Sequence, residues 1–408
     1  MAMTLADPSD MVATSPPRAA SAAAVATAGI RDPRLDFFRG VTMFIILIAH
    51  TPGNWLTLWI PARFGFSDGT EVFVFLSGMA SAIAFGKVFR EQGLPMGTAR
   101  VAFRCWQVYW AHISLFIAIA VTMAALNATD LFNRDYVGQL NLYPFFKNPM
   151  TNLPALVTLT YVPNYFDILP MYLVVLAMMP LVVALHRIVP IAALVFVVAV
   201  WAAAGFGGLA LPAEPWSERE WFFNPFGWQL VFFTGFAFMS GWLPAPVVDK
   251  RLIILAVLIV LTIVPFAYFR LLGAFPELRG IRGDIRFFIQ KTDFGILRYI
   301  HFLALAYLGW VAVGPRGTRL LPPSHDSVGA RVWRVVLKAI MKVGQQSLAV
   351  FIASMYLARL LGVLLDVLGR TYLTMIFVNL LGFALLIGVA YGAGWFKSHP
   401  WRKRQGAA

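Results

Sequence analysis

Hydrophobic residues run along the chain in long blocks that are separated by short polar stretches. Blocks long enough to cross about 30 Å of hydrocarbon as a helix lie at 36–57, 68–89, 101–126, 166–186, 188–207, 227–243, 251–272, 294–313, 345–368 and 372–396. The pattern predicts an all-α integral membrane protein, a single bundle of about ten transmembrane helices. Segments 127–165 and 273–293 are expected to be loops with short helices, and no internal repeat or second domain is evident.

Composition supports this prediction. The chain has 408 residues, of which 60% are hydrophobic and only 13% are charged, and a soluble domain of this length needs far more charge on its surface. The net charge of +14 comes mostly from residues between the hydrophobic blocks. This placement indicates membrane orientation and makes nucleic acid an unexpected partner. The single cysteine, Cys105, excludes an internal disulfide and a multi-cysteine metal site, and no metal site is predicted.

The distribution of lysine and arginine predicts the orientation. Positive charges concentrate on one side of the predicted bundle: Arg31, Arg34, Lys87, Arg90, Arg100, Lys250, Arg251, Arg316, Arg319, Arg331, Arg334 and the C-terminal tail. Because cytoplasmic loops carry the excess of positive charge, both termini are expected in the cytoplasm. Residues 1–30 read as a disordered cytoplasmic tail, 31–397 as the membrane domain, and 398–408 as a basic cytoplasmic tail.

One segment breaks the orientation rule. Residues 277–298 carry five positive charges on the predicted outer side: Arg279, Arg282, Arg286, Lys291 and Arg298. An error in the predicted topology and a binding surface for an outer substrate are both explanations, and the sequence leaves them open.

Two ionisable residues lie in the first hydrophobic block. Even on lenient scales, a charged side chain at the centre of the membrane raises the free energy of insertion by about 2.5–3.5 kcal/mol. Ionisable residues within a hydrophobic block are therefore functional candidates. Arg39 and His50 are eleven positions apart, which puts them on nearly the same helix face and about 16 Å apart along the axis. Arg39 could instead be a snorkelling anchor, and His50 a packing histidine bonded to a neighbouring carbonyl.

Further polar residues enter the predicted bundle from the same side as His50. Asp68 and Glu71 open the second block, where they could also form a capping pair. The other polar residues predicted to lie on this side of the bundle are Asp167, Asn224, Gln229, Lys291, Asp293, Arg298 and His301. Asp293 could merely cap a helix, and Arg298 and His301 could merely pair with each other. Their convergence predicts a polar reaction chamber in the outer half of the bundle.

At the cytoplasmic side, Arg104 and Gln107 begin the third block and are well placed for a polar ligand that enters from inside. A basic and aromatic interfacial belt is the ordinary alternative. The ninth block begins with Gln345, Gln346 and Ser347, and the simplest prediction for Ser347 is a helix N-cap.

Seven motifs follow one another along the chain: "RDPRLDFFRG", "GFSDGTEVFVFLSG", "CWQVYWAHI", "FDILPMYL", "NPFGWQL", "HFLALAY" and "GQQSLAVF". Taken in order, they resemble the OpgC family of membrane succinyltransferases, which modify osmoregulated periplasmic glucans and are similar to the wider acyltransferase-3 group. Arg39 and His50 match the arginine, ten residues and histidine that mark the acyltransferase-3 group. Ala49 departs from the acidic residue that often precedes this histidine, so a carboxylate that assists His50 must come from elsewhere, with Asp68 and Glu71 the nearest candidates.

The resemblance implies a bacterial inner-membrane enzyme that moves a succinyl group from cytoplasmic succinyl-CoA, a co-substrate, to hydroxyls of a periplasmic glucan. His50 is then expected to act as general base with Asp68 or Glu71 orienting it, or to attack first and form an acyl-histidine. The basic inner face with Arg39, Arg104 and Gln107 suits the phosphates of coenzyme A. An O-acetyltransferase of another envelope glycan, a transporter or flippase, and a non-catalytic scaffold are the alternatives.

Overall fold

The computed structural model describes residues 32–129, 134–323 and 327–401, and within these the regular secondary structure is helical. The predicted N-terminal tail, 1–30, and most of the predicted C-terminal tail lie outside the described residues. The α-helices are α2 (Pro33–His50), α3 (Gly69–Asn127), α4 (Tyr143–Lys147), α5 (Pro149–Val157), α6 (Ile168–Ile188), α7 (Pro190–Gly207), α8 (Pro225–Ser240), α9 (Lys250–Ala267), α10 (Phe269–Ala274), α11 (Pro276–Asp284), α12 (Arg286–Ile289), α13 (Ile296–Val313), α14 (Val328–Gln345), α15 (Ser347–Leu368) and α16 (Tyr372–Lys397).

Seven of the described helices are long and hydrophobic enough to cross a membrane: α3, α6, α7, α9, α13, α15 and α16. The 59-residue α3 is interrupted at Gly93, whose φ of 84° is not helical, and it contains both predicted blocks 68–89 and 101–126. Blocks 36–57 and 227–243 correspond to α2, which carries three charged residues, and to the 16-residue α8. The protein is therefore a multi-pass membrane protein, and the count of ten spans is not confirmed.

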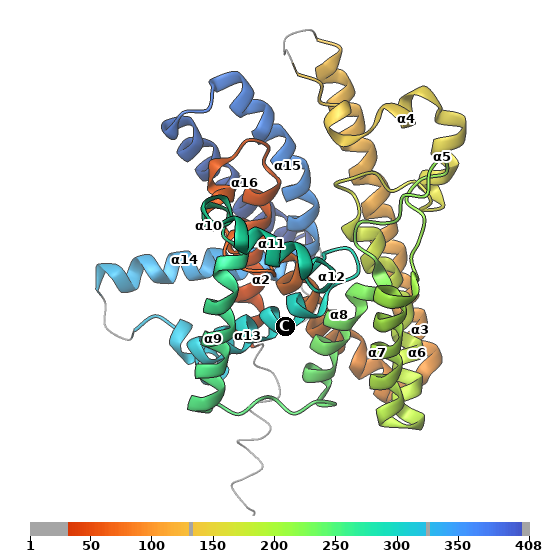
Figure 1. Ribbon diagram of the computed structural model, residues 1–408, viewed down its shortest axis with the longest axis vertical. Coiled ribbons are helices and arrows are strands. Elements are labelled where there is room, and N and C mark those ends of the chain that lie inside the picture. Colours follow the sequence, from red (N-terminus) through yellow and green to blue (C-terminus); the bar gives the residue numbers. More distant parts are fainter. Residues whose placement is uncertain (1–31, 130–133, 324–326, 402–408) are drawn as a thin grey trace, which may run out of the picture.

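The central helix of the bundle is α2, which packs against α14, α15 and α3 (Figure 1). Its crossing with α14 depends on two glycines. A Cβ added to Gly40 would fall 2.1 Å from the Ile340 carbonyl oxygen, and one added to Gly344 would fall 1.9 Å from that of Asp36. Only residues without a side chain permit this approach. On the other side, α3 packs against α6 and α8.

The two ends of α2 define the two ends of the bundle. Ser347, at the start of α15, accepts a hydrogen bond from Arg39, and Lys397, at the end of α16, donates to the Gln346 side chain at 2.7 Å. The beginning of α2 and the end of α16 therefore lie together at the Arg39 end. At the opposite, His50 end lie the starts of α3, α6 and α13, together with α10, α11 and α12. The cytoplasmic location of the Arg39 end stays a prediction.

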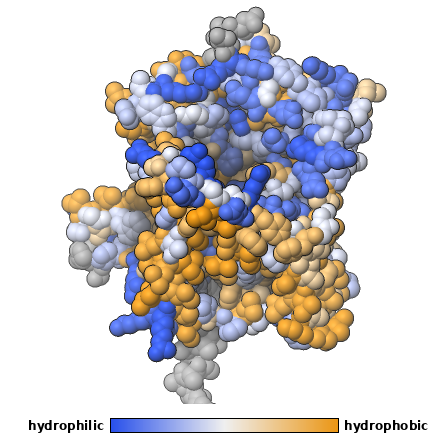
Figure 2. Space-filling model, viewed as in Figure 1, coloured by the Kyte–Doolittle hydropathy of each residue, from blue (hydrophilic) through white to orange (hydrophobic). Residues whose placement is uncertain are grey.

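The surface agrees with a membrane setting. Figure 2 shows hydrophobic side chains over the lower part of this face, including the outer surface of α9, and hydrophilic side chains gathered over the upper part. Helix α14, which projects sideways in Figure 1, does not correspond to any of the predicted hydrophobic blocks. This helix exposes valines at 328, 332 and 335 beside basic residues at 331, 334 and 338, a pattern typical of a helix that lies in the membrane interface.

Candidate active site

His50 borders a cavity of about 310 Å³, which we call the chamber. It is enclosed by α2, α3, α6 and α15, and by the loops that hold Phe222, Phe223 and Lys291. Its polar and aromatic lining residues are His50, Asp68, Thr70, Phe73, Tyr165, Asp167, Phe222, Phe223, Lys291 and Phe351. The predicted chamber at this end of the bundle therefore contains four of the expected residues: His50, Asp68, Asp167 and Lys291.

The imidazole of His50 is held by the backbone of its own helix. Its Nδ1 lies 2.8 Å from the carbonyl oxygen of Ile46, a geometry that assigns the proton to Nδ1 and leaves a lone pair on Nε2. The Tyr165 ring packs edge-on against the imidazole, with 5.5 Å between ring centroids. No carboxylate of the described residues forms a hydrogen bond with His50. The carbonyl bond of a packing histidine is thus present, yet the ring also faces an open cavity, as a reactive base requires.

Asp68 and Glu71 belong to a network of four charged side chains. They form a capping box at the start of α3, in which Asp68 accepts from the Thr70 N–H and Glu71 accepts from the Asp68 N–H, both at 2.7 Å. The Lys291 ammonium donates to Asp68 Oδ2 at 2.6 Å. Arg298 donates to Glu71 Oε1 at 2.9 and 2.5 Å. Each carboxylate is therefore neutralised by a cation from the loop before α13 or from its first turn.

The charge of Asp68 is set by this network. Burial of the carboxyl acts to raise its pKa, but the charges of Lys291 and Arg298, with hydrogen bonds from Lys291 and the Thr70 N–H, hold the pKa well below its usual range. Asp68 is thus an anion at the edge of the chamber. Glu71 is fully buried and does not line the chamber, so Asp68 is the one of the two that shares the chamber with His50.

Asp167 is a second carboxyl group in the chamber, directly before α6. Its side chain is 3% exposed and accepts a hydrogen bond from the Phe222 N–H at 3.3 Å. Burial raises its pKa to about 6, while the Phe222 hydrogen bond and the charge of Arg219 act in the opposite direction. Asp167 can therefore be protonated in mildly acidic conditions, unlike Asp68.

Three of the expected residues join backbone segments outside the chamber. Asn224 caps α8 and donates to Asp293 Oδ1 and the Leu209 carbonyl, both at 2.8 Å. Asp293 thus pairs with an amide, and Gly295 rather than Asp293 is the N-cap of α13. Gln229 donates to the Val197 carbonyl at 2.7 Å and ties α8 to α7. None of the three lines the chamber.

His301 and Arg298 do not pair with each other, so that alternative is wrong. His301 Nδ1 accepts from the Ser67 N–H at 3.2 Å and lies 2.7 Å from the Ser67 hydroxyl. Its ring packs so closely on Gly65 that a Cβ there would lie 2.1 Å from the imidazole. His301 therefore positions the turn that leads into Asp68, and it does not border the chamber.

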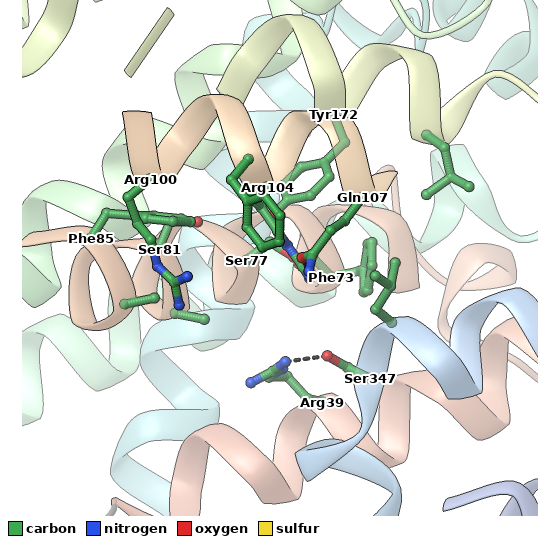
Figure 3. A pocket seen from close by; sticks show the side chains of 15 residues that line it. Arg39, Phe73, Ser77, Ser81, Phe85, Arg100, Arg104, Gln107, Tyr172 and Ser347 are labelled. Carbon is green, nitrogen blue, oxygen red and sulfur yellow. Dashed lines mark hydrogen bonds between the residues drawn. The ribbon is translucent and has the colours of Figure 1, made fainter. Parts of the chain in front are cut away.

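A second cavity, of about 230 Å³, lies at the Arg39 end, and we call it the basic cavity. Arg39, Arg104 and Gln107, the residues expected at a donor site, all line it, together with Arg100. In Figure 3, Arg39 on α2 and Ser347 on α15 lie across an open space from Arg104 and Gln107 on α3. Arg104 also donates to the Gln107 side chain at 3.1 Å. Three guanidinium groups around one cavity form a strongly anion-attracting site.

Ser347 is a partner of Arg39 and not a helix cap. Gln346 occupies the N-cap position of α15 without a side-chain capping bond, whereas the Ser347 hydroxyl accepts from Arg39 Nη2. The predicted N-cap role is therefore wrong. The contact fixes the Arg39 side chain toward the bundle interior, where it lines the basic cavity, and a snorkelling residue points instead toward the membrane surface.

Phe73 lines both cavities. Its ring stacks on Phe351, with centroids 5.2 Å apart and an interplanar angle of 19°, and both rings are buried. The aromatic pair therefore forms a wall between the chamber and the basic cavity.

Several residues that border the cavities are not among the site residues predicted from the sequence: Arg100, Tyr165, Phe222 and Phe223. Tyr165 and the two phenylalanines lie in irregular segments that no helical periodicity places. Arg100 is one of the basic residues of the predicted cytoplasmic side, and its position one turn before Arg104 on α3 is the signal that places it near the expected donor site.

Comparison with known proteins gives one match. A family model described as OpgC protein matches residues 31–398, which is most of the chain. No curated protein and no solved structure matches.

Proposed function

The chain belongs to the OpgC family, and from this premise we propose that the protein transfers succinyl groups from succinyl-CoA to hydroxyl groups of a periplasmic glucan. Family membership indicates a membrane acyltransferase of periplasmic glucans. The identity of the acyl group and of its donor is the further step. In this proposal the Arg39 end faces the cytoplasm and the His50 end faces the periplasm of the bacterial inner membrane.

One observation carries the proposal. A single helix, α2, places an arginine in a basic cavity at one end and a histidine in a polar chamber at the other, and Phe73 borders both spaces. Eleven residues of helix correspond to about 16 Å. An enzyme whose anionic donor and sugar acceptor arrive from opposite sides of a membrane requires such a pair of adjoining sites.

The chamber geometry supports a general-base mechanism. Because Nδ1 of His50 is bonded to the Ile46 carbonyl, Nε2 is the atom that takes the proton from a glucosyl hydroxyl. The hydroxyl oxygen attacks the thioester carbonyl carbon, the carbon–sulfur bond breaks, and the thiolate of coenzyme A leaves. The proton on Nε2 then passes to that thiolate. The anion Asp68 in the same chamber acts in favour of the transient imidazolium, whereas the cations Lys291 and Arg359 act against it.

The basic cavity supports binding of the donor. Arg39, Arg100 and Arg104 supply planar groups that pair with phosphate oxygens, and Gln107 and Ser347 add neutral hydrogen-bonding groups. The pantetheine arm of the donor must then pass the wall formed by Phe73 and Phe351 to bring the thioester to His50. A movement of these rings is therefore part of the proposed cycle.

The test is a reconstitution of the full-length protein in liposomes. Succinyl-CoA with a radioactive succinyl group is supplied on one side and a neutral glucan on the other, and the glucan is analysed by mass spectrometry. We expect succinyl esters on the glucan, with one coenzyme A released per ester. An O-acetyltransferase would use acetyl-CoA in preference. A transporter or flippase would move glucan across the bilayer without forming any ester, and that result would overturn the proposal.

A further inference from the structure

A third cavity, of about 200 Å³, lies at the His50 end and has no part in the mechanism above. Three arginines and one aspartate line it: Arg134, Arg359, Arg370 and Asp366. We call it the arginine cavity. It is formed by α15, the turn after α2, the C-terminal part of α3 and the loop that follows α3.

Positive charge exceeds negative charge in this cavity. Asp366 accepts from Arg370 at 2.6 Å and from the Tyr136 hydroxyl at 3.2 Å, and Arg134 Nε lies 3.3 Å from it. One carboxylate therefore serves two guanidinium groups, and no carboxylate of the described residues pairs with Arg359. The Nε atoms of Arg359 and Arg370 are buried and have no hydrogen-bond partner in the described part of the chain. Buried, unpaired guanidinium nitrogens are unfavourable unless an anion occupies the site.

Arg359 is linked to His50 by one aromatic ring. Its guanidinium carbon lies 3.9 Å from the centroid of the Tyr165 ring, and the same ring contacts the His50 ring with 5.5 Å between centroids. Tyr165 has a φ of 91°, a region that a bulky residue rarely adopts, and its hydroxyl donates to the Met355 carbonyl at 2.5 Å. Strained backbone of this kind gathers at functional sites. The strain here holds the ring between the chamber and the arginine cavity.

The turn after α2 brings the arginine cavity close to the chamber. Gly53 has a φ of 74°, and a Cβ added to it would lie 2.5 Å from the guanidinium carbon of Arg370. Gly53 is only three residues beyond His50. His50 is therefore linked through this turn to Arg359 on α15 and to Arg370 directly after α15.

We propose that the arginine cavity is a carboxylate-binding subsite, which receives the free carboxylate of a succinyl group whose thioester or ester carbonyl lies at His50. The proposal rests on the proposed function. Guanidinium groups bind carboxylates through paired hydrogen bonds. The two centroid distances place Arg359 within about 10 Å of His50. An extended succinyl chain is about 4 Å from carbonyl carbon to carboxylate carbon, and contacts of about 3 Å at each end match this length. Because the Tyr165 ring contacts both Arg359 and His50, displacement of this ring by the bound succinyl group is part of the proposal.

The test compares two four-carbon donors, succinyl-CoA and the uncharged butyryl-CoA, with the reconstituted full-length protein. Arg359→Gln should lower the ratio of kcat/KM for succinyl-CoA over butyryl-CoA at least tenfold, and Arg359→Lys should retain part of it. The matched control is Arg270→Gln, an exposed arginine on α10 that lines none of the three cavities. An unchanged ratio, or an equal loss with both donors, contradicts donor recognition.

The second arm uses two acceptors, a neutral glucan and one that already carries succinate. If Arg359→Gln keeps the wild-type donor ratio but lowers kcat/KM at least tenfold for the succinylated glucan alone, the bound carboxylate belongs to the acceptor. No change on either acceptor together with an unchanged donor ratio overturns the subsite. A third arm does not need activity: succinate, but not butyrate, should raise the Tm of the wild type and not of Arg359→Gln. If the wild type transfers no acyl group, the proposed function fails, while this shift still supports or refutes the subsite.

Discussion

Arg298 donates from Nε and Nη2 to a single oxygen of Glu71, at 2.9 and 2.5 Å, and both side chains are buried. The pair joins the first turn of α13 to the first turn of α3. Arg298 Nη2 also lies 3.7 Å from Asp68 Oδ2, which Lys291 holds at 2.6 Å. The Asp68 carboxylate, which lines the chamber with His50, is thus fixed by two cations.

Replacing Glu71 with Gln should destabilise the protein strongly, because it leaves the buried Arg298 charge without its partner. Loss of one member of a buried pair costs about 3–5 kcal/mol. The free energy of unfolding in detergent is the measurement, and Glu71→Gln/Arg298→Met should lose less than the sum of the single variants. Glu91→Gln is the matched control, since Glu91 pairs with Lys87 at 3.9 Å in an exposed position and should change stability by less than about 0.5 kcal/mol. Equal losses at the two sites would contradict the argument.

His50→Ala should remove acyl transfer while the protein still folds. A general base typically contributes 10²–10⁴-fold, so we expect kcat to fall by at least about 100-fold with little change in Tm. His399→Ala, at an exposed position beyond α16, is the control and should keep wild-type activity. A His50→Ala enzyme that retains more than a tenth of the wild-type kcat would exclude His50 as the base.

Arg39→Ala should weaken use of the donor, because Arg39 lines the basic cavity at the end opposite His50. We expect the KM for succinyl-CoA to rise about tenfold or more, and the KM for glucan to stay within about twofold. Arg251→Ala, an exposed arginine at the start of α9, should change neither. A selective rise in the KM for glucan would contradict the donor assignment.

Much of this site could be predicted from single residues within hydrophobic blocks. The eleven-residue spacing of Arg39 and His50 predicts that they lie about 16 Å apart along one helix, on nearly the same face, because helical rise and turn are regular. The capping box of Asp68 and Glu71 could also be predicted, since capping is local in sequence. From the sequence, Asp68 and Glu71 could be predicted to cap the helix or to assist His50. The structure adds the cations Lys291 and Arg298, more than two hundred residues away.

What could not be predicted depends on contacts between distant segments. Asn224, Gln229, Asp293 and His301 are polar residues at the correct depth, yet their partners are a neighbouring backbone or side chain. Depth along a helix says nothing about which neighbour a side chain meets. The amphipathic α14 could not be predicted from continuous hydrophobic blocks, because basic residues interrupt the valines along its sequence.

Asp167 should make stability depend on pH between about 4 and 6. Its pKa is raised from 3.8 to about 6 in the folded protein, so the folded state holds a proton there that the unfolded state has released. Stability from this group is full below about pH 4 and is lost as pH rises to about 6. The expected loss is about 3 kcal/mol, from 1.36 kcal/mol per pKa unit. Unfolding measured from pH 4 to 7 should show it in the wild type and not in Asp167→Asn, and parallel curves would contradict it.

Phe73→Ala should connect the chamber with the basic cavity. The ring stacks on Phe351 and borders both spaces, so its removal gives water a path to a thioester bound near His50. We expect succinyl-CoA hydrolysis without glucan to rise at least about fivefold, while transfer to glucan falls. Phe73→Leu fills most of the space and should stay close to the wild type. Phe116→Ala is the control for lost packing, because Phe116 is fully buried but lines neither cavity. This variant should lower Tm, since truncation of a buried phenylalanine costs about 3–5 kcal/mol, but it should not raise the rate of hydrolysis. If both alanine variants hydrolyse the donor equally, the increase reflects loosened packing, and Phe73 is not the wall between the two cavities.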